Sequence, residues 1–401
     1  MSGPFRHDFD KLNRLPPYIL SVVIDLLKSA RRAGEDIIDL GMGNPDLPTP
    51  PHVVEKICEA AHDPRNHRYS ASRGIPNLRA AICEWYEREH DVVLDPETEA
   101  IAVIGAKEGL SHFVLMTIGA GDVVLCPDPA YPIHPYSVII AGGDLRSVPL
   151  TADTDFIANL ELAYSRTWPK PKMLIISFPN NPTTQVADLA FLERIVAFAR
   201  SRDLMLLHDF AYAEVCFDGF KPSSILEVPG AKDIAIEFTS LSKSHSMAGW
   251  RVGFAAGNRE MIAALARIKS YLDYGMPQAI QIGAIVALRG PQDVVRENCD
   301  EYRVRRDTLI DGLGQAGDGS WKIEKPLATM FVWAQIPEPF RAMGSLEFSK
   351  WLLRESGVAV SPGVGFGESG EGHVRFALVE NKHRIRQAVR GIRRSLREAS
   401  I

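Results

Sequence analysis

Short apolar segments alternate with amphipathic segments through the middle of the chain, and this alternation constrains the fold more than any other feature. Seven segments are brief and almost wholly apolar, as the buried strands of a parallel sheet are. They are Ile101–Ile104, Val123–Cys126, Leu145–Val148, Met173–Ser177, Leu204–His208, Ile234–Phe238 and Val252–Ala256. Between most of them lie stretches with helical periodicity, such as Leu189–Arg202 and Met261–Tyr271. The alternation predicts an α/β fold with a mostly parallel seven-stranded sheet, flanked by helices and joined by right-handed crossovers.

The pattern changes after about residue 291. A long polar helix is expected over Val294–Ala316, followed by strands at Trp321–Lys325 and Met330–Ala334 and a helix over Leu346–Glu355. This order predicts a smaller α+β domain. The 401 residues, with 46% hydrophobic content, suffice for two cores.

Composition excludes several classes of protein. The net charge of −5 offers no basic footprint for nucleic acid or for a membrane surface. The longest apolar runs, such as Met173–Phe178, are far too short to span a bilayer. The five cysteines show no CxxC pair and no metal-ligand spacing, so free thiols and no metal site are expected. The N-terminal residues lack the apolar core of a signal peptide, which predicts a cytoplasmic enzyme.

One segment, residues 240–253, combines the groups that an aldehyde cofactor with a phosphate requires. Lys243 supplies an amine that can form a Schiff base with an aldehyde. Ser240, Ser242 and Arg251 can hold a phosphate through charge-assisted hydrogen bonds. A surface lysine is the competing interpretation. The neighbouring hydroxyls and the arginine favour a pyridoxal 5′-phosphate (PLP) site instead.

Other polar residues follow predicted strands. Gly105-Ala106-Lys107 opens a helix, where free N–H groups and the helix dipole attract phosphate. Asp209 stands at the carboxyl end of a strand, where ligands bind in open α/β sheets; a helix N-cap is the alternative.

Arg375 interrupts an apolar string, Val374–Ala377, and a charge in a strand of this kind needs a partner. Its guanidinium matches a carboxylate in bidentate fashion. A structural salt bridge is the alternative.

Motifs spread along the chain resemble those of the fold-type-I PLP-dependent aminotransferases, class I/II. Besides the lysine segment they are Arg14-Leu15-Pro16-Pro17-Tyr18, Met42-Gly43-Asn44-Pro45-Asp46, Ser72-Arg73-Gly74-Ile75-Pro76 and His373-Val374-Arg375-Phe376-Ala377-Leu378. The resemblance runs from about Leu15 to about Ile392 and is closest to the bacterial glutamate–pyruvate (alanine) aminotransferases.

The resemblance implies a role for each candidate residue. Lys243 binds PLP and moves a proton, Asp209 pairs with the pyridine nitrogen, and Tyr212 bonds the phenolic oxygen. Further cofactor contacts are implied for Ala106, Lys107, Tyr131, Asn181, Ser240, Ser242 and Arg251, and for Tyr69 toward the other subunit. Substrate contacts are implied for Arg375 at the α-carboxylate and for Asn181, Gly43 and Tyr18.

The resemblance also implies domains and assembly. A large PLP-binding domain is expected over residues 46–291, and a discontinuous small domain, with an N-terminal arm, over residues 1–45 and 292–401. Because Tyr69 would serve the neighbour, a homodimer with shared active sites is expected. Its other partners would be its small-molecule substrates, amino acids and 2-oxo acids.

The implied reaction moves an amino group between an L-amino acid and a 2-oxo acid with ping-pong kinetics. The stretch Lys269–Gln278 contains no arginine, which disfavours an aspartate enzyme and favours alanine/pyruvate with glutamate/2-oxoglutarate. Met276-Pro277-Gln278 departs from the alanine subgroup, so methionine, other neutral amino acids and diaminopimelate stay open. A PLP-dependent lyase is a further alternative. A regulator is disfavoured because no basic helix-turn-helix precedes Gly41.

Overall fold

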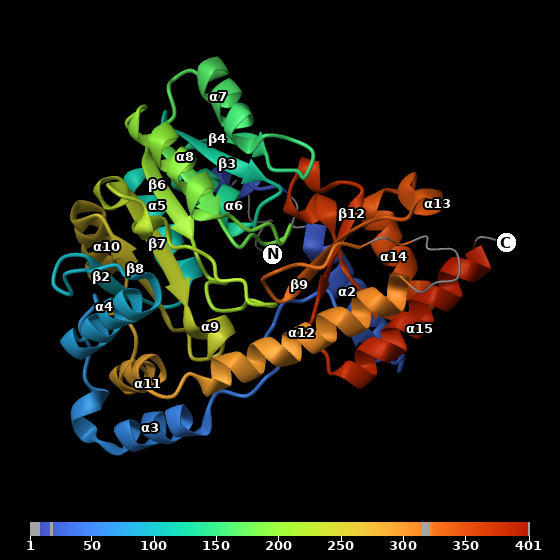
Figure 1. Cartoon of the computed structure of the whole chain (residues 1–401), viewed down its shortest axis with the longest axis horizontal. Helices are drawn as coiled ribbons and strands as arrows, with labels where there is room; N and C mark the ends of the chain where they lie inside the picture. The colour runs from blue at the N-terminus through green and yellow to red at the C-terminus, as the bar shows by residue number, and fades with distance from the viewer. Residues whose placement is uncertain (1–8, 17–18, 315–320, 322, 400–401) are drawn as a thin grey trace, which may run out of the picture.

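A seven-stranded sheet forms the centre of the larger part of the molecule (Figure 1). The computed structural model describes residues 9–16, 19–314, 321 and 323–399. The strand order is β2-β8-β7-β6-β5-β3-β4. The strands are β2 (Ala100–Val103), β3 (Val123–Asp128), β4 (Asp144–Pro149), β5 (Met173–Ser177), β6 (Met205–Asp209), β7 (Ala235–Ser240) and β8 (Gly253–Gly257). All neighbouring pairs are parallel except those of β8, which runs antiparallel to β7 and β2. The predicted mostly parallel seven-stranded sheet is confirmed.

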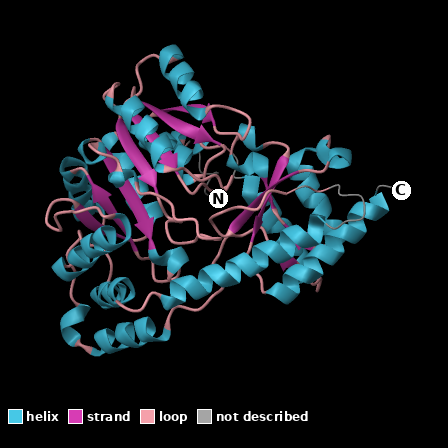
Figure 2. Ribbon diagram, viewed as in Figure 1, coloured by secondary structure: helices cyan, strands magenta, loops and turns pink. Residues whose placement is uncertain are grey.

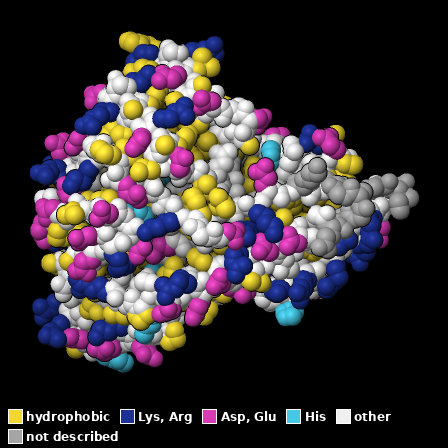
Figure 3. Space-filling model, viewed as in Figure 1, with side chains coloured by type: hydrophobic (Ala, Val, Ile, Leu, Met, Phe, Trp, Pro, Cys, Tyr) yellow, Lys and Arg dark blue, Asp and Glu magenta, His cyan; other side chains and the backbone are white. Residues whose placement is uncertain are grey.

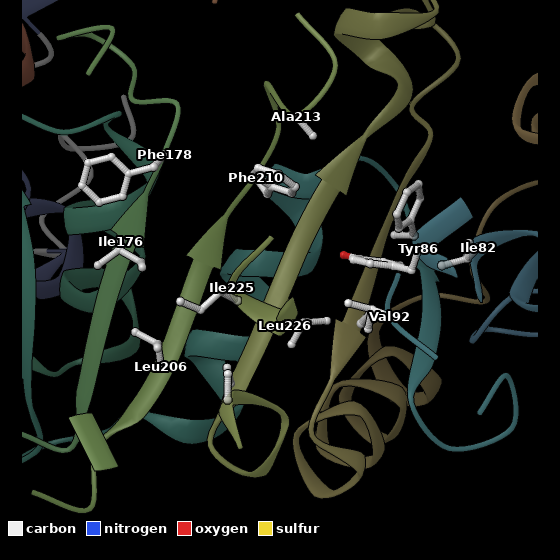
Figure 4. Packing of buried hydrophobic residues seen from close by; sticks show 14 of the residues in the cluster. Ile82, Tyr86, Val92, Ile176, Phe178, Leu206, Phe210, Ala213, Ile225 and Leu226 are labelled. Carbon is white, nitrogen blue, oxygen red and sulfur yellow. The ribbon is translucent and has the colours of Figure 1, made fainter. Parts of the chain in front are cut away.

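Side chains of the central strands alternate between two apolar layers. Leu174 and Ile176 of β5 join one core, and Met173 and Ile175 join the other. Figure 4 shows the first layer, where Ile176 and Leu206 lie beside Phe178 and Phe210. Burial on both faces explains why these strands are almost continuously apolar rather than alternating.

Helices cover both faces of the sheet, and Figure 2 shows them arranged around the strands. One core receives apolar side chains from α5 (Ala106–Thr117), α6 (Ile133–Ala141) and α10 (Arg259–Leu272). The other receives them from α3 (Pro51–His62), α4 (Pro76–His90), α7 (Phe156–Arg166), α8 (Leu189–Arg200) and α11 (Gln278–Arg289). The short helix α9 (Leu241–Ser244) follows β7 directly. Short 3-10 helices are η1 (Pro64–His67), η2 (Ile225–Glu227), η3 (Ala231–Asp233), η4 (Gly363–Phe366) and η5 (Glu368–Gly370).

A second, smaller unit has its own apolar core. Its sheet has the order β11-β12-β9. Its elements are β9 (Phe331–Gln335), β10 (Val358–Ala359), β11 (Ser361–Pro362), β12 (His373–Ala377), α13 (Glu338–Arg341), α14 (Gly344–Ser356) and α15 (Lys382–Ala399). The long helix α12 (Asp293–Gly314) runs from beneath the large sheet to this unit (Figure 1).

Part of the N-terminal segment joins the smaller unit. The segment contains α1 (Asp10–Asn13), α2 (Ile19–Arg32) and β1 (Ile38–Asp39), and α2 packs against α14. Just after α1, Arg14 instead donates to the Gly143 carbonyl, beside β4 of the large sheet, at 3.4 Å. β1 pairs with β10 in parallel. This pairing supports a discontinuous small domain, and the limits 1–45, 46–291 and 292–401 stay a proposal.

The strand expected at Trp321–Lys325 is wrong. Of its described residues, 321 and 323–325, none lies in a strand. Trp321 packs edge-on against Phe348 and Phe376, and its indole N–H donates to the Gln335 carbonyl at 2.8 Å. Trp321 and Ile323 are apolar because they pack in the small core, not because they pair in a sheet.

The visible surface mixes charges of both signs, while Lys and Arg gather over α15 at the lower right of Figure 3. The apolar side of α15, including Ile385 and Ile392, packs into the small core. Among the helices of the described residues, none has the length and apolar character needed to cross a membrane.

The central strand β6 provides a test of this packing. Leu207 is fully buried among side chains of the α5 and α10 face. Leu207→Ala should lower the free energy of unfolding by about 2–5 kcal/mol, because a cavity replaces the side chain. Urea unfolding followed by fluorescence measures the loss. Leu162→Ala, at a leucine 47% exposed on α7, is the control and should cost under about 0.5 kcal/mol; equal losses would contradict the assignment.

Candidate active site

A cavity of about 870 Å³ lies where the carboxyl edge of the large sheet meets the smaller unit. Twelve of the residues singled out from the sequence line it: Gly43, Ala106, Lys107, Tyr131, Asn181, Asp209, Tyr212, Ser240, Ser242, Lys243, Arg251 and Arg375. Residues of α2, among them Leu27 and Arg31, line its outer end together with Asp39 and Glu380.

Strand pairing brings several of these residues together. β5, β6 and β7 are adjacent and parallel, and Ser177 pairs directly with Asp209. Ser240 ends the next strand. Ligand-binding residues therefore follow the carboxyl ends of neighbouring strands, as expected in an open α/β sheet.

One end of the cavity can hold an anion. Gly105 caps α5 with a φ of 78°, and a β-carbon there would lie 2.5 Å from Nη2 of Arg251. Arg251 donates to the Ala248 carbonyl at 3.0 Å and stands just before β8, whose reversed direction brings it to this edge. Ser240 Oγ accepts from the Ser242 N–H at 3.1 Å. The N–H groups at the start of α5, the guanidinium of Arg251 and the hydroxyls of Ser240 and Ser242 therefore surround one space, which we call the anion seat.

Lys243 lines the cavity, and its side chain is half-buried. Its Nζ donates to the Gly43 carbonyl at 3.2 Å. Burial, together with the charges of Arg375 and Arg251, lowers the pKa of Lys243 to about 8, while the charge of Asp209 opposes this shift. At neutral pH roughly a tenth of this amine is therefore unprotonated, far more than for a lysine with the ordinary pKa, and a nucleophile or a base requires that form.

Asp209 has a partner that the sequence did not reveal. Its Oδ2 lies 2.8 Å from Nε2 of His134, a fully buried histidine on α6. Its Oδ1 accepts the Ala211 N–H at 3.2 Å, the type of bond that a cap would make, but the following residues form a turn and not a helix. The one sequence signal for His134 is its position three residues after Tyr131.

Tyr212 and Tyr131 approach the cavity from different elements. Tyr212 is buried with its ring edge-on to Phe331 at 5.7 Å. Burial raises the pKa of its hydroxyl well above the ordinary value, and the charge of Arg375 opposes this only in part. Tyr212 therefore stays a neutral hydrogen-bond donor. The ring of Tyr131 lies edge-on to His134 at 5.9 Å, and the Lys107 amine stands 5.9 Å from its centroid.

Arg375 faces the cavity from β12 and contacts neutral oxygens. Nη1 donates to Oδ1 of Asn181 at 2.7 Å, and Nη2 donates to the Gly41 carbonyl at 3.0 Å. The guanidinium lies 4.0 Å from the ring centre of Phe331 and 4.5 Å from that of Phe366. These rings orient the cation. Phe366 comes from the glycine-rich segment Gly363–Gly367, which the sequence places near the substrate as a loop of the small domain.

Tyr69, predicted for the site, is not among the residues that line the cavity. Tyr69 is 85% exposed, and its ring lies 4.6 Å from that of Tyr274 on the outside of the same chain. Tyr18 lies outside the described residues. The roles predicted for both stay predictions.

Comparison with known proteins agrees with this geometry. The family model described as aminotransferase class I and II matches residues 35–392. The chain belongs to this family. The transferase activity expected from the motifs is thereby confirmed at the level of the family.

The aminotransferase has relatives that match it over nearly its whole length. It is 55% identical over 389 residues to the glutamate-pyruvate aminotransferase AlaC of Escherichia coli, covering 97% of this chain and 94% of that protein. It is 44% identical over 386 residues to the LL-diaminopimelate aminotransferase of Moorella thermoacetica, covering 96% and 97%. The apo structure of BacF from Bacillus subtilis superposes with a TM-score of 0.90 at 36% identity, covering 97% and 98%.

The reactivity of Lys243 can be measured directly. In protein stripped of small molecules, acylation of Lys243 should be half-maximal near pH 8, since amines react in the neutral form and its pKa lies at about 8 instead of 10.5. Mass spectrometry of labelled peptides measures the pH profile, with the exposed Lys221 as reference in the same digest. Arg251→Gln removes a like charge and should move the midpoint upward. A midpoint at the ordinary lysine value in the unmodified protein would contradict the burial argument.

Proposed function

We propose that this aminotransferase binds PLP and moves an amino group between an L-amino acid and a 2-oxo acid, with alanine/pyruvate and glutamate/2-oxoglutarate as the main substrates. The observation that supports this best is the buried Lys243 amine, whose pKa is lowered to about 8, between an anion seat and Arg375. We also propose a cytoplasmic homodimer whose active sites are shared through Tyr69.

The residues present fit PLP. A dianionic phosphate suits the α5 N-terminus at Ala106 and Lys107 together with Ser240, Ser242 and Arg251. The close approach of Arg251 to Gly105 leaves no room for a β-carbon, which fits a backbone cradle. Asp209 would bind the protonated ring nitrogen, and Tyr131 would lie against the ring. Tyr212 and Asn181 would donate hydrogen bonds to its phenolic oxygen.

Each side chain then has a chemical task. When bound, PLP supplies an aldehyde that bonds the amino nitrogen and a protonated ring that withdraws electrons from the substrate Cα. Asp209, oriented by His134, keeps that ring nitrogen protonated. Arg375 binds the α-carboxylate in bidentate fashion, and Asn181 orients the guanidinium from the side. Gly43 lets the substrate lie close to the backbone, with Tyr18 proposed to cover it.

Lys243 moves the proton. Its Nζ is unprotonated in a large share of molecules near pH 8. It takes the proton from the Cα of the donor in the first half-reaction, and it gives a proton to the Cα of the product amino acid in the second. A 2-oxo acid leaves, and a second one enters to take up the amino group, which gives ping-pong kinetics.

A second donor, LL-diaminopimelate, is the alternative that a specific observation favours. The relative from Moorella thermoacetica bears that activity in its name. Arg31, Asp39 and Glu380 line the outer end of the cavity and offer both signs of charge, as a distal amino-acid group would need. Methionine, other neutral amino acids and lyase chemistry remain for the assays to decide.

The half-reaction with single amino acids tests the proposed function. Purified protein loaded with PLP should change its absorbance fastest with alanine and glutamate, and each should yield its 2-oxo acid. Lys243→Ala should slow this by at least roughly 10⁴-fold, because it removes both the cofactor bond and the base. Lys221→Ala, at an exposed lysine, is the control. Fastest reaction with LL-diaminopimelate would favour the alternative, and ammonia release without any 2-oxo acceptor would mean a lyase.

Arg375→Lys tests the carboxylate site. A point charge cannot replace the guanidinium fork, so KM should rise about 10- to 100-fold for every amino acid, the loss expected for charge-assisted hydrogen bonds. Steady-state kinetics with alanine and glutamate side by side measure it. A rise confined to glutamate would show that Arg375 binds the distal carboxylate instead.

A further inference from the structure

Behind the anion seat lies an ion cluster that the proposed mechanism does not use. It consists of Glu108 and His112 on α5, Lys269 on α10 and Asp273 just after α10; we call it the Lys269 cluster. Lys269 Nζ lies 2.9 Å from Oε1 of Glu108 and 3.1 Å from Oδ1 of Asp273. Nδ1 of His112 lies 2.5 Å from the same Glu108 oxygen.

The lysine of this cluster is fully buried, with an exposed fraction of 0%. Burial alone raises the pKa of Glu108, but His112, Lys269 and a backbone N–H outweigh it and hold the pKa below its ordinary value. The carboxylate is therefore charged, and the buried ammonium is its counterion. Removing the ammonium would leave two partly buried carboxylates with only His112 between them, which a site of this kind tolerates poorly.

On its inner side the cluster touches the anion seat. Oε2 of Glu108 accepts the N–H of Ile104 at 2.7 Å. Ile104 directly precedes Gly105, and its carbonyl accepts from Nη2 of Arg251 at 3.5 Å. Glu108 thus fixes the peptide that leads into the seat, and Lys269 fixes Glu108.

On its outer side the cluster holds a loop that projects from the surface. Oδ1 of Asp273 accepts the N–H of Gly275 at 2.6 Å. Gly275 has a φ of 77° and packs so closely on residue 71 that a β-carbon would lie 2.9 Å from the Ala71 carbonyl oxygen. Tyr274, between them, is 60% exposed and meets the ring of Tyr69. The residue proposed to serve the neighbouring subunit therefore contacts the loop that the ion cluster anchors.

A metal ion is the competing occupant. Glu108, His112 and Asp273 lie close enough to share one. The ammonium of Lys269 already lies within hydrogen-bond distance of both carboxylates, however, so a cation of the chain itself satisfies them.

We propose that Lys269 is a positioning residue that joins the phosphate seat of its own subunit to the Asp273–Met276 loop facing the partner, so that cofactor binding and dimer association strengthen each other. This proposal rests on the proposed PLP function and homodimer. By linkage, a shared structural element must act equally in both directions: bound PLP tightens the dimer, and the dimer tightens PLP.

The test compares unmodified protein with Lys269→Met, which keeps the length of the side chain and removes its charge. Absorbance titration of PLP-free protein gives the Kd of PLP, and sedimentation with and without PLP gives the dimer constants. Unmodified protein should dimerise about tenfold more tightly with PLP, within the usual range of coupling between sites. In Lys269→Met that ratio should fall, leaving only the coupling that Tyr69 supplies by itself, and the Kd of PLP should rise about tenfold.

Lys172→Met is the matched control. Lys172 also binds α5, but at its far end, where Nζ donates to the Thr117 carbonyl at 2.7 Å and to Asp122. This variant should change neither constant. A general loosening of the protein would weaken both constants of Lys269→Met without changing their ratio, and that result would overturn the proposal.

If Lys269→Met does not fold, Asp273→Asn decides the matter. The amide keeps an oxygen for Gly275 and removes the charge that Lys269 contacts, so both effects should persist at reduced size. An unchanged ratio in a folded Asp273→Asn would overturn the coupling, as would a divalent metal that restores the ratio in Lys269→Met. If unmodified protein takes up no PLP, the proposed function itself is contradicted. That result differs from loss of coupling, in which PLP still binds.

Discussion

The register between the parallel strands β5, β6 and β7 is the constraint on which the rest of the site depends. Ser177 pairs with Asp209, and Asp209 pairs with Phe238, so the carboxyl ends of the three strands lie side by side, with β7 two residues longer. A slip of one residue would turn Asp209 to the opposite face of the sheet. That face already belongs to His208, whose Nδ1 lies 2.7 Å from Glu237 in a fully buried pair. Each of the two neighbouring residues thus has an ionisable partner on its own side.

Much of the fold could be predicted because its signals are local. The central strands are buried on both faces, so apolar runs in the sequence mark them. The predicted ends of the seven strands lie within two residues of the observed ends. The pattern failed at Trp321, since a side chain that fills a core between helices and sheet looks the same in sequence as one in a strand. The reversed direction of β8 was also beyond prediction, because strand length and apolarity carry no sign of direction.

The candidate site could be predicted where one residue type has few other uses in its context. A lysine amid hydroxyls and an arginine inside an apolar strand are of that kind, and the structure brings Lys243 and Arg375 into one cavity. His134 and Phe366 could not be found in this way, since a buried histidine or phenylalanine is ordinary in any core. The Lys269 cluster joins residues from two helices and a loop, and only the packing of α10 against α5 makes them neighbours.

The order of the site along the chain has a consequence during synthesis. The anion seat and the reactive amine come from Gly105 to Arg251, whereas Arg375 comes from β12, close to the C-terminal end. Domains fold largely as they leave the ribosome. The large sheet, with its lysine, can therefore fold before Arg375 has been synthesised. In that interval the cavity lacks the guanidinium that the proposed carboxylate site requires. The last strand of the smaller unit supplies that group and completes the cavity.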